Sequence, residues 1–156
     1  MTDRELMRHA IAVIAYRGGK PLRNAPETFA EFKLGEGGNT PLVLVSHLAD
    51  LMEWALTQLE GQPRFPNRKP TTWQAEVDRF YAALRALDAY LASDQPIQCD
   101  LERLLAGPVA DSINHIGQLM MLRRLAGSAV YGENYFVADI VTGRVGKEQS
   151  PPVKPF

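Results

Sequence analysis

The chain has 156 residues, of which 46% are hydrophobic and 22% charged, and its formal net charge is -1. This length is sufficient for one globular domain that buries a core without disulfide or metal staples, so we expect a single domain over residues 1–156. The near-zero charge gives no electrostatic support for binding nucleic acid or an anionic membrane, and we expect neither partner.

The first predicted helix covers residues 3–16. Thr2 and Glu5 have the spacing of a capping box, in which both side chains bond to free backbone amides at a helix start. Residues 17–21 follow with two glycines and a proline, which we expect to end the helix. Residues 21–39 then form an irregular loop, and Phe29 and Phe32 are spaced to anchor it through a short helical turn.

The second predicted helix covers residues 41–59. Thr40 is a typical N-cap, and Pro41 is favoured at the first helical position. The stretch is apolar almost all round, which indicates a helix buried on more than one side. A proline-rich connection over residues 61–70 is long enough to cross one end of a bundle.

Two more helices are predicted over residues 72–92 and 108–126. The first carries aromatic and leucine residues at helical spacing, which is typical of a core stripe, and the second follows Gly107 and Pro108. The tail, 127–156, is too apolar to be disordered as far as about Val145. The predicted fold class is all-α, a four-helix bundle with an irregular N-terminal loop and a C-terminal extension.

The strongest chemical signal is the pair Asp111 and His115. Residues four apart project from the same face of a helix, so the carboxylate and the imidazole point the same way, and we expect this face to be turned inward. His47 has a similar setting on the second predicted helix. Two imidazoles and a carboxylate are a common ligand set for a divalent transition metal, because zinc accepts them with a water in the remaining position. His47, Asp111 and His115 are therefore candidate metal ligands, and a bundle of helices would let their side chains converge.

The same residues also have structural explanations. Asp111 is near the start of a predicted helix, where the helix dipole favours a carboxylate. His115 would be a core histidine bonded to Asn114, Gln118 or Asp111, and His47 would bond to a backbone carbonyl or to the tail.

A family resemblance favours the metal. The segment His115-Ile116-Gly117-Gln118-Leu119, followed by Leu122-Arg123-Arg124-Leu125-Ala126-Gly127, resembles the last-helix signature of the DinB/YfiT-like superfamily, His-x-x-x-His-x-Gly-Gln-(Ile/Leu). Val45-Ser46-His47-Leu48 with Trp54 resembles its second-helix histidine segment. The resemblance implies an up-down-down-up bundle and a metal held by His47, Asp111 and His115. Asp111 stands where most members have histidine, which implies a more negative ligand shell.

The resemblance also implies a chemistry. Characterised relatives include transferases of low-molecular-weight thiols and a thiol-dependent isomerase, and a metal with an open position lowers the pKa of a bound thiol. We expect a divalent-metal-binding protein acting as a thiol S-transferase on a small-molecule substrate. The alternatives are a metal-dependent hydrolase and a non-enzymatic, stress-related or structural dimer with a vestigial metal site. Zinc or nickel is the expected metal, with iron or manganese as the next choices.

Two further expectations concern environment and assembly. The lone Cys99 excludes an internal disulfide and fits a reducing compartment, and the polar start of the sequence lacks a hydrophobic signal core. We therefore expect a cytoplasmic protein. We also expect a homodimer. If the protein is structural and not an enzyme, the exposed residues Phe29, Phe32, Tyr135 and Phe136 are expected to form an interface instead of a lid.

Overall fold

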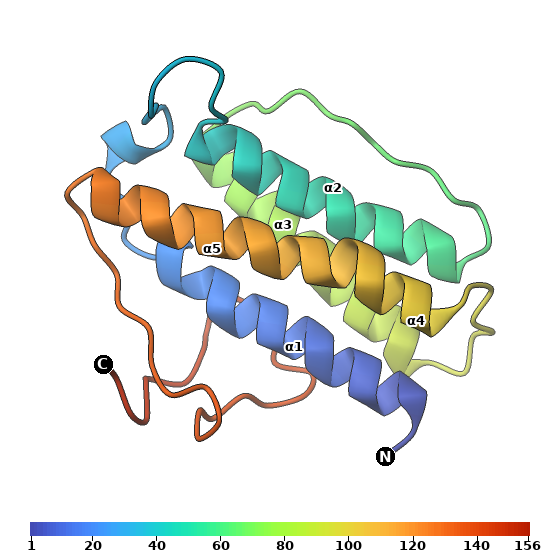
Figure 1. Cartoon of the computed structure of the whole chain (residues 1–156). Coiled ribbons are helices and arrows are strands. Elements are labelled where there is room, and N and C mark those ends of the chain that lie inside the picture. The colour runs from blue at the N-terminus through green and yellow to red at the C-terminus, as the bar shows by residue number, and fades with distance from the viewer.

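The computed structural model describes residues 1–156 and is all-helical, as predicted (Figure 1). Four long helices lie side by side along the molecule, and α2 packs against α3 and α5 while α1 packs against the same two helices. No helix combines the length and the apolar character needed to cross a bilayer. The elements are α1 (Asp3–Leu22), the 3-10 turn η1 (Glu27–Phe29), α2 (Pro41–Leu59), α3 (Trp73–Ala92), α4 (Leu101–Leu104), the π turn η2 (Leu105–Val109) and α5 (Ala110–Leu125).

Helix α1 begins at the predicted capping box but ends later than predicted. The Thr2 hydroxyl accepts from the Glu5 amide, and the Glu5 carboxylate accepts from the Thr2 amide at 2.7 Å. The helix then continues to Leu22 through Gly18, Gly19 and Pro21, so the predicted end at residue 16 is wrong. A Cβ on Gly18 would lie 3.3 Å from the Phe80 ring, so the glycine allows α1 to approach α3 closely, and this contact outweighs its low helix propensity.

Helix α2 has the predicted bounds. The Thr40 hydroxyl accepts from the Val43 amide at 3.3 Å, and Pro41 occupies the first turn. At the other end, the Leu59 carbonyl accepts from the Tyr90 hydroxyl near the end of α3 and from the Gln98 amide just beyond it. The C-terminal ends of α2 and α3 therefore lie together. Figure 1 shows the connection between them returning along the whole length of the bundle.

Helix α5 is reached through a distorted turn. Residues 101–109 form α4 and η2, and Gly107 has the non-helical dihedrals φ -87° and ψ -105° inside the π turn. Gly107 therefore marks a kink between α4 and the helix that continues through α5, and Asp111 lies in the first turn of α5. A π turn offsets the face of the helix that follows it. The side chains of Asp111 and His115 come directly after this offset.

The core lies between the four long helices, and its fully buried members include Ile11, Leu48, Phe80 and Leu119. Phe29 is also buried, with its ring 5.6 Å from that of Trp73, so the expectation that it is an exposed interface residue is wrong. The 3-10 turn that carries Phe29 closes one end of the bundle, because the side chain fills space between the loop and the start of α3.

The tail, 127–156, contains neither helix nor extended strand, and one isolated bridge joins Glu133 to Pro155. It is held by α1. Glu133 is 1% exposed and accepts from the Tyr16 hydroxyl at 2.6 Å, while the Lys20 ammonium lies 2.9 Å from the same carboxylate oxygen. The Arg17 guanidinium stacks on the Tyr135 ring at 3.8 Å. Phe136, in contrast, is 98% exposed.

Candidate metal centre

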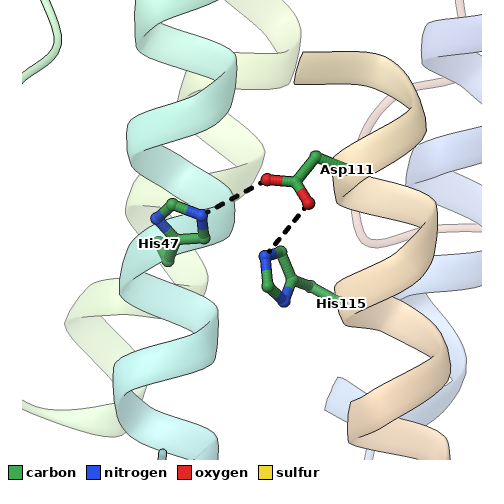
Figure 2. Close-up of side chains that lie close together, drawn as sticks. All are labelled: His47, Asp111 and His115. Carbon is green, nitrogen blue, oxygen red and sulfur yellow. Dashed lines mark ion pairs between the residues drawn. The ribbon is translucent and has the colours of Figure 1, made fainter. Parts of the chain in front are cut away.

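The structure brings the three predicted ligands together at the seam between α2 and α5 (Figure 2). One carboxylate oxygen of Asp111 lies 3.5 Å from Nε2 of His47, and the other lies 3.4 Å from Nε2 of His115. The two imidazole rings meet edge to face, with centroids 4.8 Å apart. One ligand atom from each residue can be chosen so that all three lie within 4.8 Å of one another.

The centre is more open than the sequence predicted. The side chains of Asp111, His47 and His115 are 43%, 35% and 16% exposed, and Gln118 on the same face is exposed. The expectation of a fully inward face is therefore wrong. This face of α5 instead lies along the seam with α2: Leu119 is buried in the core, while the side chains of Asp111 and His115 lie at the partly exposed edge. An open position beside the three side chains is what an external ligand requires.

His115 is oriented by a hydrogen bond within α5. Its Nδ1 lies 2.8 Å from Oε1 of Gln118, three residues later. When Nδ1 carries the ring proton and donates to this amide oxygen, Nε2 has a free electron pair on the side that faces Asp111. That is the state in which a neutral imidazole binds a cation.

His47 is positioned by packing and by the backbone around it. Its ring centroid is 5.9 Å from that of Phe65, which also lies 5.8 Å from the Trp54 ring. Phe65 comes from the connection between α2 and α3, so this loop covers one side of the centre. One residue before His47, the Ser46 carbonyl accepts from Arg79 of α3 at 2.8 Å, which fixes the backbone of α2 at this turn.

The observed spacing is somewhat wider than the ligand shell of a small divalent cation. Zinc lies about 2.0–2.1 Å from nitrogen and oxygen ligands, so two ligands at tetrahedral positions are about 3.3 Å apart. The separations of 3.5 and 3.4 Å at Asp111 involve its two different oxygens, and with one donor atom taken from each residue the three atoms lie within 4.8 Å of one another. The donor set of two imidazoles and one carboxylate also suits nickel, iron and manganese. The residues therefore fit a metal in chemistry, and the three donor atoms would have to move closer together around it.

The structural explanations of these residues receive mixed support. Asp111 lies in the first turn of α5, just after the kink at Gly107, so the helix start also favours a carboxylate at this position. His47 bonds to no backbone carbonyl and to no tail residue. His115 does bond to Gln118, as one alternative predicted, but through the nitrogen that faces away from Asp111.

Two residues at the centre were missed by the sequence analysis. Phe65 lies in a proline-rich connection whose path depends on the whole bundle, so no local pattern connects it to His47. Arg79 is on the helix that carries the aromatic stripe, and only its charge among apolar neighbours hinted at a buried partner.

Comparisons with protein-family models, with curated proteins and with solved structures find no match to this chain.

Proposed function

We propose that the chain is a divalent-metal-binding protein of the DinB/YfiT-like kind, with His47, Asp111 and His115 as its ligands, and that it activates a low-molecular-weight thiol for transfer. One observation carries the proposal: three donor atoms from two helices lie within 4.8 Å and remain partly open to solvent.

The order and direction of the helices support the same kind of protein. The C-terminal ends of α2 and α3 lie together, and Arg4 at the start of α1 donates to the carbonyls of Ser93 and Gln95, just after α3. The long connection between α2 and α3 makes this possible. This is the arrangement expected of an up-down-down-up bundle, in which the second and third helices run the same way (Figure 1).

The chemistry follows from the donor set. A bound divalent cation lowers the pKa of a coordinated thiol and so supplies a thiolate near neutral pH. The chain's own residues hold the site in shape: Gln118 fixes the His115 ring, and Phe65 shields one side of His47 from water. The exposed side of Asp111 leaves an approach for the thiol and its acceptor.

The first experiment is the metal content of the tag-free protein and of three histidine variants. We expect about one equivalent of zinc, nickel, iron or manganese in the wild type and its loss in His47→Ala and His115→Ala. His9→Ala is the matched control, because His9 is the third histidine and bonds to Thr142 of the tail, away from the centre. It should keep full occupancy.

The same proteins then test the reaction. Metal-loaded wild type should accelerate the coupling of cysteine to 1-chloro-2,4-dinitrobenzene, and His9→Ala should match it. Absence of metal after incubation with excess ion would overturn the proposal as a whole. One tightly bound equivalent without any coupling above the metal-free protein would overturn the transferase and leave a metal-binding protein.

A further inference from the structure

A groove lies along the seam between α2 and α5, beside the metal centre. It has a volume of about 560 Å³, within the usual range for small-molecule sites of roughly 300–1,000 Å³. Its lining includes Leu34 of the loop before α2, Leu44 of α2, and Asn114, Gln118, Met121 and Leu125 of α5. None of these side chains carries a charge.

The groove and the centre are adjacent and share Gln118. Gln118 lines the groove and is also the residue that bonds to His115 at 2.8 Å. Leu44 lies one helical turn before His47 on the same face of α2. A molecule bound at the centre through one atom can therefore extend into the groove without crossing the bundle.

The groove walls are apolar and exposed. The side chains of Leu34, Met121 and Leu125 are 58%, 52% and 48% exposed, although leucine and methionine are usually buried. From residue 118 to residue 125 a helix rises about 10 Å, which sets the length of the wall on α5. The polar groups at the centre's end are the amides of Asn114 and Gln118.

We infer that this groove binds the uncharged, apolar part of the small molecule that the metal centre acts on. The inference rests on the proposed function for the atom that binds at the centre, and it assigns the substrate class: a thiol or thiol acceptor with an apolar chain of about 10 Å. Charge complementarity selects the occupant, because a charged chain would meet no opposite charge in the groove and would lose hydration.

The groove is tested first without metal, using hexan-1-ol as the probe and methyl-labelled methionine as the reporter. Among the five methionines, Met121 lies in the groove, whereas Met52 is fully buried between the helices. Hexan-1-ol should shift the Met121 methyl signal to saturation and leave that of Met52 in place, and ethanol at the same concentration should do neither.

Two variants make the test specific. Leu125→Glu places a charge in the groove at a half-exposed position and should weaken hexan-1-ol binding at least about 10-fold, because the probe would then lie against a carboxylate. Leu6→Glu is the matched control, since Leu6 is 54% exposed on α1 and outside the groove. It should bind the probe as the wild type does.

Chain length is then tested on the metal-loaded protein. Each fully buried methylene strengthens binding about fourfold, so hexane-1-thiol should bind at least about 10-fold more tightly than ethanethiol, even in a half-open groove. Leu125→Glu should remove this difference while keeping the metal.

The outcomes separate the two proposals. A saturable shift of the Met121 signal in a protein that binds no metal would overturn the proposed function but would still show that the groove binds an apolar molecule. A loaded centre with no Met121 shift and no effect of chain length would overturn the groove and keep the proposed function. A Met121 signal that moves on dilution of the protein alone would identify the groove as a contact between two copies, which also overturns the inference.

Discussion

Helix α2 carries two polar clusters, and they differ in how completely their atoms are paired. Around Arg79, the guanidinium donates to Asp50 at 2.7 Å, to Glu76 at 3.0 Å and to the Ser46 carbonyl at 2.8 Å. Asp50 and Glu76 are 3% and 4% exposed. Around His47, the Asp111 carboxylate lies 3.5 Å from His47 and 3.4 Å from His115, and none of the three residues is fully buried.

The difference indicates two roles for similar residue types. A buried charge is stable only when it is paired and hydrogen-bonded, so the Arg79 cluster has the partners that a structural element requires. Burial by itself would raise the pKa of Glu76, but hydrogen bonds from Thr71 and Arg79 bring the pKa below its usual value. The His47 cluster is paired less closely, because Asp111 lies 3.5 and 3.4 Å from the two histidines and all three side chains are partly exposed. We therefore expect the first cluster to determine stability and the second to determine ligand binding.

The largest expected effect comes from Arg79→Leu. This variant leaves Asp50 and Glu76 buried without their cation, and such a loss costs about 3–5 kcal/mol. Urea unfolding monitored by circular dichroism measures the change in free energy. Metal affinity, measured in the folded protein, should change by less than about threefold if the clusters are independent.

Arg68→Leu is the control for this prediction. Arg68 is 59% exposed in its pair with Glu53, and an exposed pair contributes about 0–1 kcal/mol. If Arg79→Leu were no more destabilising than Arg68→Leu, the Arg79 cluster would not be the structural element that the geometry indicates. If it lost metal as well, the two clusters would be coupled through Ser46.

Structural features that are determined by neighbouring residues could be predicted from the sequence, whereas features that depend on distant contacts could not. The bounds of α2 follow from Thr40 and Pro41, which act within one turn, and the pair Asp111 and His115 follows from helical spacing. The predicted end of α1 is wrong because Gly18 stays in the helix, where it packs against Phe80, about 60 residues away in the sequence.

The same distinction between local and distant causes applies to the metal centre. His47 could be joined to Asp111 and His115 only by an inference about the whole fold and by a family resemblance, since no spacing rule connects residues on different helices. The openness of the centre and the place of Phe65 depend on the path of a long connection, and the pairing of Glu133 with Tyr16 depends on how the tail folds back on α1. Neither path is determined by local propensity.

An intermediate effect is expected from Glu133→Gln, which tests a second fully paired cluster. Tyr16 and the Val153 amide donate to different oxygens of Glu133, so the single amide oxygen of glutamine can accept from only one of them, and the variant also loses the charge that pairs with Lys20, at a cost of about 1–3 kcal/mol. Burial raises the pKa of Glu133, yet the hydrogen bond from Tyr16 and the Lys20 ammonium bring the pKa below its usual value.

The sign of the pH dependence follows. A carboxylate whose pKa is lower in the folded protein stabilises the fold above its unfolded pKa, and this contribution is lost as the pH falls through the folded pKa. The difference in unfolding free energy between wild type and Glu133→Gln should therefore be largest near neutral pH and shrink in acid. Asp139→Asn, at a 57% exposed carboxylate, is the control and should cost less. A difference that grew in acid would contradict the pairing.

Gln118→Ala is expected to have the smallest effect on stability and a specific effect on metal binding by His47, Asp111 and His115. Gln118 is exposed, so its truncation should change the unfolding free energy by less than about 0.5 kcal/mol. It removes the acceptor that holds the His115 ring, and loss of a group that orients a metal ligand typically weakens metal binding about 10–100-fold. Competition with a chromophoric chelator measures this affinity.

Two further variants are controls for this prediction. Asn114 is an exposed neighbour that does not bond to His115, so Asn114→Ala should bind metal as the wild type does. Gln118→Glu should also bind metal as the wild type does, because its carboxylate can accept from Nδ1 of His115. Equal affinities in all four proteins would mean that His115 needs no orientation, and the division between a paired structural cluster and an open binding cluster would then rest on His47 and Asp111 alone.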